Sequence, residues 1–263
     1  MTSQTPLVLT IAGFDPSGGA GIIADVKTIV HCGCRPAAAI TSLTFQNAAG
    51  VYGATHETAK SLRAQVVPVI KEQQLAAVKI GMLPTAELVW EASALVAENH
   101  LPGPIIDPVL KSTSGYELIE PEAIEVWLRE LMPLARLITP NIPEAESLTG
   151  IKIFDERGMH EAAAKLRQMG ARAVLIKGGH ASWEPGEGNG EQGQKQAADI
   201  LDDAGEVTSF RGDWITAPLV RGTGCMLSSA IAAGLAHGAD LKTSISDAKK
   251  YVAAEISKFK TEN

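Results

Sequence analysis

The sequence lacks three features that are typical of secreted and membrane proteins. Its three cysteines are an odd and small number for 263 residues, which does not suggest a disulfide framework. No apolar run approaches the roughly 20 residues needed to cross a bilayer. Residues 1–6 carry no basic segment ahead of an apolar one, so no secretory signal is predicted. We therefore expect a cytoplasmic protein without a membrane partner.

Concentrated positive charge is also absent. The formal net charge is −7 and Lys and Arg form no dense cluster, whereas binding a polyanion needs a basic face, so no nucleic-acid partner is expected. Cys32-Gly33-Cys34 lacks two further ligands at zinc spacing, because the six histidines are scattered singly. We interpret these two cysteines as structural.

Short apolar runs alternate with longer amphipathic stretches along the whole chain. We expect strands at 7–11, 37–45, 77–80, 104–106, 136–139 and 173–176, and helices at 21–32, 59–74, 85–99, 121–131, from Pro143 onward, and at 155–169. Near-continuous apolar strands that alternate with helices predict a mostly parallel sheet covered on both faces. The pattern nowhere pauses for a linker, so residues 1–263 are predicted to form a single α/β domain.

Residues 184–196 break this pattern. They are rich in Gly, Glu and Gln and have too few apolar side chains to pack, which predicts a mobile loop. Behind them, residues 198–201 and 206–210 flank Asp202-Asp203-Ala204-Gly205, which predicts an antiparallel hairpin.

Polar or flexible residues follow the predicted strands, where ligands bind in open α/β sheets. They are Asp15 with Gly18–Gly21, Gln46-Asn47, Gly81-Met82, Asp107, Asn141 with Glu144, and Lys177. Phosphoryl transfer needs carboxylates for a metal and a cation for the phosphates, and Asp107, Glu144 and Lys177 fit these requirements. Each also has a structural interpretation: Asp107 ends a strand, Glu144 complements a helix dipole, and Lys177 lies on the surface.

Gly222-Thr223-Gly224-Cys225 is the sharper motif, because it directly precedes a helix of small and apolar residues at 226–235. Glycines that open a helix expose backbone N–H groups at its positive end and make an anion site. Such a site suits a transferring phosphoryl group. We expect Cys225 to have a lowered pKa there and to accept the proton of a substrate alcohol. The alternative is a tight helix–sheet contact with an inert thiol.

Two functions of other classes compete with a kinase. Gly19-x-Gly21-x-x-Ala24 fits the loose dinucleotide fingerprint of a nicotinamide-dependent oxidoreductase. Against it, residues 14–17 separate the strand from the glycines, and the second strand ends at Gln46 instead of an acidic residue. No Gly-Lys-Ser/Thr follows, which excludes a P-loop. A non-catalytic binding protein would need the pocket without a base or metal ligands.

Taken together, the motifs resemble the hydroxymethylpyrimidine/phosphomethylpyrimidine kinases of thiamine biosynthesis, which belong to the ribokinase-like superfamily. The resemblance runs from about residue 7 to residue 255. The segments that carry it are residues 12–21 with Ala24-Asp25, residues 39–43 with Gln46-Asn47, residues 79–83, Asp107-Pro108-Val109, residues 139–145, residues 177–180 and residues 222–225.

The resemblance implies a ribokinase-like three-layer sandwich, usually dimeric. It would transfer the γ-phosphate of ATP to the hydroxymethyl group of an aminopyrimidine, and often a second phosphate to the monophosphate. By position, the residues lining the pyrimidine pocket are Gly13, Asp25, Gln46, Met82 and Val109. Those serving ATP are Asn141 and Lys177, and those serving Mg²⁺ are Asp107 and Glu144. Cys225 stands where most sugar kinases of the superfamily carry an aspartate base, and Gly222 and Gly224 are the other expected catalytic residues.

Three residues depart from the family pattern. Phe14 and Phe45 replace residues that are usually smaller beside Gly13 and Gln46, and Arg221 stands where histidine is expected. These departures affect which acceptor molecule is expected and leave the expected reaction, phosphoryl transfer, unchanged. A pyridoxine/pyridoxal kinase of the same superfamily is the alternative, because it also phosphorylates a hydroxymethyl group on an aromatic nitrogen ring.

Overall fold

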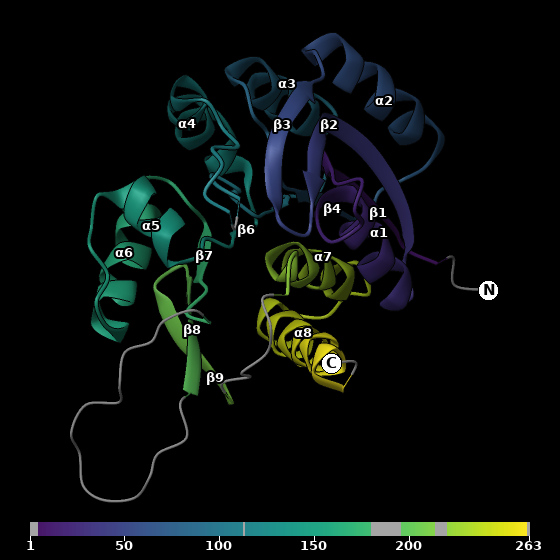
Figure 1. Ribbon diagram of the computed structural model, residues 1–263. Coiled ribbons are helices and arrows are strands. Elements are labelled where there is room, and N and C mark those ends of the chain that lie inside the picture. Colours follow the sequence, from purple (N-terminus) through teal and green to yellow (C-terminus); the bar gives the residue numbers. More distant parts are fainter. Residues whose placement is uncertain (1–4, 113, 180–195, 214–219, 262–263) are drawn as a thin grey trace, which may run out of the picture.

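The computed structural model describes residues 5–112, 114–179, 196–213 and 220–261. Within these residues the strands form one nine-stranded sheet, in the order β3-β2-β1-β4-β5-β6-β7-β8-β9 (Figure 1). The strands are β1 (Leu7–Phe14), β2 (Arg35–Asn47), β3 (Gly50–His56), β4 (Ala77–Ile80), β5 (Ile105–Ile106), β6 (Leu137–Ile138), β7 (Ala173–Ile176), β8 (Gln196–Asp203) and β9 (Glu206–Asp213). The six central strands, β2, β1, β4, β5, β6 and β7, pair in parallel, while β3, β8 and β9 pair antiparallel at the two edges.

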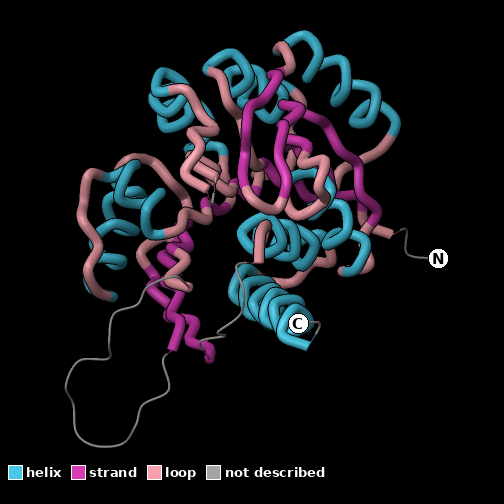
Figure 2. The backbone as a smooth tube through the Cα atoms, viewed as in Figure 1, coloured by secondary structure: helices cyan, strands magenta, loops and turns pink. Residues whose placement is uncertain are grey.

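Helices cover both faces of the sheet, and Figure 2 shows them flanking the strands. One face carries α1 (Gly21–His31), α7 (Thr223–Ala236) and α8 (Leu241–Thr261). The other carries α2 (Ala59–Glu72), α3 (Ala86–Glu98), α4 (Pro121–Val126) with the π-helical turn Trp127–Leu131 and the 3₁₀ turn Met132–Leu134, α5 (Ile142–Thr149) and α6 (Glu156–Gln168). Along β1, Leu9 and Ile11 pack in the α2–α6 core, whereas Val8 packs in the α1–α7–α8 core, as the two-residue period of a strand requires.

Local sequence explains several helix starts. The side chains of Thr58, Thr85 and Asp155 each accept a hydrogen bond from a backbone N–H in the first turn of α2, α3 and α6. Such N-caps satisfy donors that the helix itself leaves unpaired.

The sheet and its two helix layers confirm the predicted single-domain α/β fold with a mostly parallel sheet. Among the described helices, none is long and apolar enough to traverse a bilayer.

The structure differs from the expectations in two places. β3 was not predicted, because this exposed edge strand, GVYGATH, has few apolar residues to mark it. Helix α7 begins at Thr223, ahead of the predicted residue 226, since Gly222 serves as its N-cap. The predicted hairpin is confirmed as β8–β9. The predicted loop at 184–196 lies outside the described residues, apart from Gln196, which begins β8.

The chain order reverses at β1, whose two parallel neighbours are β2 and β4. In open α/β sheets such a reversal leaves a crevice outside the carboxyl ends of the strands, and ligands bind there. The carboxyl ends of β1, β4, β5, β6 and β7 share one edge of this sheet. The predicted functional residues therefore lie at the edge where a ligand site is expected.

Candidate active site

Two glycine-rich segments meet backbone to backbone at this edge. Gly222 has φ +76°, and a Cβ placed on it would lie 2.2 Å from the carbonyl oxygen of Gly19. Gly21 has φ +57°, and its Cβ would lie 2.2 Å from the carbonyl oxygen of Gly13. Only glycine fits both the left-handed backbone and the close approach. The first turns of α1 and α7 are thereby brought together, and each presents the positive end of a helix.

Asp107 and Lys177 come from neighbouring parts of the sheet and meet beside α7. Lys177 Nζ donates to Asp107 Oδ1 at 2.6 Å, and Thr139 Oγ1 lies 3.3 Å from the same oxygen. A Cβ placed on Gly224 would lie 3.0 Å from Asp107 Oδ2 and 3.1 Å from Lys177 Nζ. A carboxylate, an ammonium group and a helix N-terminus thus converge on one point, as the strand-end prediction required.

Glu144 and Asn141 form a reciprocal capping box at the start of α5. Asn141 Oδ1 accepts from the backbone N–H of Glu144 at 2.9 Å, and Glu144 Oε2 accepts from that of Asn141 at 2.8 Å. Burial raises the pKa of Glu144 to about 7, and the charge of Asp107 adds to this rise, while Lys177 opposes it. Glu144 therefore has a structural role as a helix cap, and the charges of Asp107 and Lys177 also act on its carboxyl group.

Cys225 lies in the first turn of α7, half-buried, and accepts a hydrogen bond from the backbone N–H of Gly21. We expected a lowered pKa, and this expectation is wrong. Burial raises the pKa of the thiol to about 11, despite the nearby charge of Lys79 and the Gly21 hydrogen bond, which both lower it. Desolvation of the thiolate outweighs the two groups that stabilise it.

A buried ionic cluster lies beneath this thiol and was not predicted. Lys79 Nζ is 2.9 and 2.8 Å from the two carboxylate oxygens of Asp25, and neither side chain has any exposed surface. Asp25 also accepts from Thr10 Oγ1 at 2.6 Å and Ser229 Oγ at 2.9 Å. Ser229 follows Cys225 by four residues in α7, so both lie on the same side of the helix.

The position of Asp25 differs from the one expected. We placed its side chain on the wall of the pyrimidine pocket, whereas the structure places it inside the protein with hydrogen-bond partners from three other elements. The signal for this cluster is Lys79 itself. The strand Ala77-Val78-Lys79-Ile80 is apolar apart from the lysine, so it is expected to be covered on both faces of the sheet. A lysine buried there needs a carboxylate partner.

Four other residues of the expected acceptor pocket lie around the ends of β1, β2, β4 and β5. A Cβ on Gly13 would lie 2.9 Å from Met82 Sδ, so these two residues are in contact. Met82 is held by Thr41 Oγ1, which donates to its carbonyl oxygen at 2.7 Å. Val109 is half-buried and lines a cavity of about 10 Å³ with Gly81 and other residues. Gln46, half-buried, is the residue before the last of β2.

The three residues that depart from the family pattern have different surroundings. Phe45 packs over Gly53 of the neighbouring strand and remains 54% exposed. The carbonyl of Phe14 accepts from Thr44 Oγ1 at 2.8 Å. Arg221 reaches Asp15 and Gln46, and its side chain is 18% exposed.

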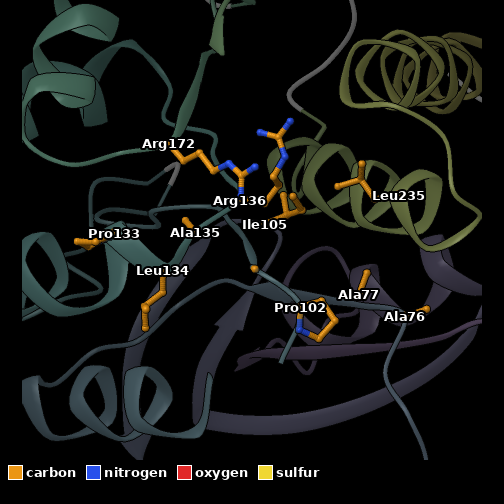
Figure 3. A pocket seen from close by; sticks show the side chains of 11 residues that line it. Ala76, Ala77, Pro102, Ile105, Pro133, Leu134, Ala135, Arg136, Arg172 and Leu235 are labelled. Carbon is orange, nitrogen blue, oxygen red and sulfur yellow. The ribbon is translucent and has the colours of Figure 1, made fainter. Parts of the chain in front are cut away.

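Another cavity, of about 290 Å³, lies at the opposite edge of the sheet (Figure 3). It is lined by residues that precede or begin the parallel strands, together with Leu235 of α7: Ala76, Ala77, Pro102, Gly103, Ile105, Pro133, Leu134, Ala135, Arg136 and Arg172. None of the predicted site residues lines it. The cavity is therefore separate from the carboxyl-edge site.

A mostly parallel sheet between helix layers, with a lysine, a carboxylate and a glycine-opened helix at its carboxyl edge, defines a kinase of the ribokinase-like class that acts on a small acceptor. The comparisons then specify the family. The family model described as phosphomethylpyrimidine kinase matches residues 15–262 of the sequence, and the chain belongs to that family.

Individual relatives agree with this membership. A hydroxymethylpyrimidine/phosphomethylpyrimidine kinase of Streptomyces coelicolor is 38% identical over 97% of this chain and 92% of its own. The crystal structure of a phosphomethylpyrimidine kinase from Clostridium difficile 630 has a TM-score of 0.81 at 36% identity, and covers 96% of this chain and 100% of that one. Both the family and the enzyme class predicted from the sequence are confirmed, which disfavours the oxidoreductase and the binding protein.

A more distant relative shows a nucleotide site in this class. The pyridoxal kinase of Staphylococcus aureus in complex with AMP-PCP and pyridoxal has a TM-score of 0.83 at 28% identity, and covers 96% of this chain and 88% of that one. AMP-PCP is an ATP analogue, so the ATP prediction is supported. The pyridoxal kinase is a structural relative, and the sequence relatives carry the pyrimidine kinase name.

Proposed function

We propose that this protein transfers the γ-phosphate of ATP to the hydroxymethyl group of 4-amino-5-hydroxymethyl-2-methylpyrimidine, and a second phosphate to the resulting monophosphate. The observation that carries the proposal is the Asp107–Lys177 pair, with Lys177 Nζ 2.6 Å from Asp107 Oδ1, beside the backbone of Gly224 at the start of α7. Phosphoryl transfer relies on positioning and on electrostatic stabilisation, and these groups supply both. Membership in the phosphomethylpyrimidine kinase family supports the choice of acceptor.

Lys177 and Asn141 would serve ATP, with the ammonium group of Lys177 opposing the charge of the phosphates. Asp107 and Glu144 would hold Mg²⁺, because buried carboxylate oxygens are the hard ligands that this ion prefers. No preformed group of three ligating side chains occurs in the described part of the chain. That suits Mg²⁺, which usually combines one or two carboxylates with substrate phosphates and water. The ion would neutralise charge on those phosphates.

The backbone N–H groups opened by Gly222 and Gly224 would hold the transferring phosphoryl group, since α7 presents its positive end there. The hydroxyl oxygen of the acceptor would form its bond to phosphorus as the bond to the β-phosphate oxygen breaks. Cys225 would take the hydroxyl proton from its thiolate form, which Lys79 and the Gly21 N–H stabilise and which burial disfavours. Asp25 would act indirectly, because its buried ion pair holds Lys79 in place.

The acceptor ring would lie among Gly13, Gln46, Met82 and Val109. The close approach of Met82 to Gly13 would form one wall of this pocket, and Gln46 would offer an amide that can both donate and accept at a ring edge. The phosphoryl site and this pocket share the edge of the sheet at which the chain order reverses, so acceptor and phosphate are delivered to one place.

Turnover of ATP with Mg²⁺ on three acceptors tests the proposal. We expect product with the aminopyrimidine and with its monophosphate, and a lower kcat/KM with pyridoxal. Lys177→Met should lower kcat by about 10²–10³-fold, as the loss of one transition-state contact does. Arg157→Gln, at a side chain that is 85% exposed, is the matched control. The absence of product from all three acceptors would refute the proposed function. A preference for pyridoxal would show that pyridoxal, not the aminopyrimidine, is the acceptor.

Cys225→Ala tests the proposed base. It should lower kcat by about 10²–10⁴-fold, the range of general bases, while ATP binding is retained. An unchanged kcat would assign the thiol to the pocket wall alone.

We further propose a cytoplasmic homodimer. Exposed apolar side chains gather on the β2–β3 hairpin at one edge of the sheet: Leu43 is 43%, Phe45 54% and Tyr52 67% exposed. An apolar edge of this kind is a surface that proteins usually cover. Analytical ultracentrifugation of the wild type and of Tyr52→Lys should show a dimer that the substitution weakens, whereas a monomeric wild type would contradict the assembly.

A further inference from the structure

Arg221 joins two segments that border the acceptor pocket. Its Nη1 donates to the carbonyl oxygen of Asn47 at 2.5 Å and to Ser17 Oγ at 3.2 Å. Its Nη2 donates to Asp15 Oδ2 at 3.2 Å and to Gln46 Oε1. The guanidinium therefore lies between the turn that follows β1 and the end of β2, directly before the N-cap of α7.

Asp15 fixes this guanidinium in place. Its carboxylate is 1% exposed, and its second oxygen accepts from the backbone N–H and the hydroxyl of Ser17 at 2.8 and 2.6 Å. In the described part of the chain, Arg221 is the cation that pairs with this buried charge. A buried carboxylate without a counterion is strongly disfavoured, so Arg221 has little freedom to leave its position.

The position of Arg221 determines the orientation of the Gln46 amide. A guanidinium has donors and no acceptor, so the amide oxygen of Gln46 must face it. The amide nitrogen then donates to Thr44 Oγ1 at 2.7 Å, and that hydroxyl donates in turn to the carbonyl oxygen of Phe14 at 2.8 Å. Every hydrogen bond in this chain has one possible direction, because it begins at a pure donor and ends at a pure acceptor.

We propose that Arg221 is a specificity-determining residue of the acceptor site. It holds Gln46 so that one amide N–H, left over after the bond to Thr44, is offered to a lone pair on the acceptor ring. This inference rests on the proposed function, in which Gln46 contacts the acceptor. A neutral histidine, the residue expected at position 221, can donate or accept through its ring nitrogens and would leave the amide free to turn over.

The fixed amide selects a chemical class of acceptor. A 4-aminopyrimidine edge presents a ring-nitrogen lone pair next to an amino N–H, which matches the free N–H and the second oxygen lone pair of Gln46. The 4-oxo analogue, 5-hydroxymethyl-2-methylpyrimidin-4-one, presents a ring N–H next to a carbonyl oxygen, which is the reverse order. Opposed donors or acceptors leave buried polar groups unpaired and discriminate strongly.

The test compares kcat/KM for the 4-amino and 4-oxo acceptors, with ATP held constant. Wild type should prefer the 4-amino ring by about 10²-fold or more. Arg221→Lys retains a donor-only cation and should keep this ratio within about threefold. Arg221→Gln offers an acceptor as well as a donor and should lower the ratio at least about tenfold. Arg221→Gln leaves the buried carboxylate of Asp15 without a counterion and could misfold for that reason. The double variant Asp15→Asn with Arg221→Gln removes this charge and should show the same lowered ratio.

Gln46→Glu gives an independent readout. A carboxylate has no N–H to offer, but it pairs well with Arg221, so the variant should fold. Each ring then meets one matched and one opposed contact, so the preference for the 4-amino ring should be lost. An unchanged ratio in Arg221→Gln and in the Asp15→Asn double variant would overturn the inference, as would an unchanged preference in Gln46→Glu. If wild type phosphorylates neither ring, the proposed function itself fails, and this result is distinct from a ratio that does not change.

Discussion

Replacing Asp25 with asparagine removes the carboxylate that compensates a fully buried ammonium group. Both side chains of the Asp25–Lys79 pair have no exposed surface, and their contacts are 2.9 and 2.8 Å. Burial by itself lowers the pKa of Lys79, but the negative charge of Asp25 and other nearby groups more than offsets this, so the pKa lies above its usual value. In Asp25→Asn this charge no longer offsets burial, so the pKa of Lys79 falls, and an ammonium group at this site has no counterion at its original position.

The expected loss can be worked out from the contacts. The Asp25 carboxylate accepts four hydrogen bonds, two from Lys79 and one each from Thr10 and Ser229. An asparagine presents one acceptor oxygen in its place. Breaking a buried pair from one side costs about 3–5 kcal/mol, a large part of the 5–15 kcal/mol that typically stabilises a domain. For a chain of this length, the Tm should fall by about 6–20 °C.

Urea unfolding followed by circular dichroism, together with a thermal melt, measures this loss without any ligand. Glu161→Gln is the matched control, because it breaks the exposed Arg157–Glu161 pair, whose side chains are 85% and 53% exposed, and should change stability by about 0.5 kcal/mol or less. The double variant Asp25→Asn with Lys79→Met removes both charges and should recover part of the loss. A loss under about 1 kcal/mol in Asp25→Asn, or a double variant as unstable as the two single losses added, would refute this account.

Three further outcomes follow from the site. Alkylation of Cys225 by iodoacetamide, read by site-specific mass spectrometry, should keep rising beyond pH 10, because the reactive thiolate forms only as pH approaches the pKa of about 11; a plateau below pH 9 would contradict the raised pKa. Gly222→Ala should destabilise the protein by about 1–3 kcal/mol more than Gly150→Ala, since both positions have positive φ but a Cβ at Gly150 meets nothing within 4 Å; equal losses in urea unfolding would mean that the contact with Gly19 relaxes freely. Asp107→Asn should weaken Mg²⁺ binding and so raise the Mg²⁺ concentration needed for half-maximal turnover, which a magnesium titration measures; an unshifted titration would mean that Asp107 does not bind the ion.

Much of the fold was predictable because buried parallel strands leave a plain signal. The run Ala173–Ile176 was predicted with its exact bounds, and the helix expected from residue 155 begins at Glu156, with Asp155 as its N-cap. β3 was missed since an exposed edge strand needs few apolar residues. The start of α7 was placed three residues late, because a glycine N-cap at positive φ has no sequence signature beyond the glycine itself.

The sequence by itself determined the sheet class, the kinase motifs and the residues that follow each parallel strand, because these depend on the order and spacing of residues along the chain. Tertiary structure decided their surroundings. It moved Asp25 from the pocket wall into a buried pair with Lys79, reversed the expected pKa of Cys225 and placed Arg221 against Gln46. Desolvation and hydrogen-bond direction depend on groups that are up to about 200 residues apart in sequence. Gly222-Thr223-Gly224-Cys225 marks the site, and only packing determines the charge of its thiol.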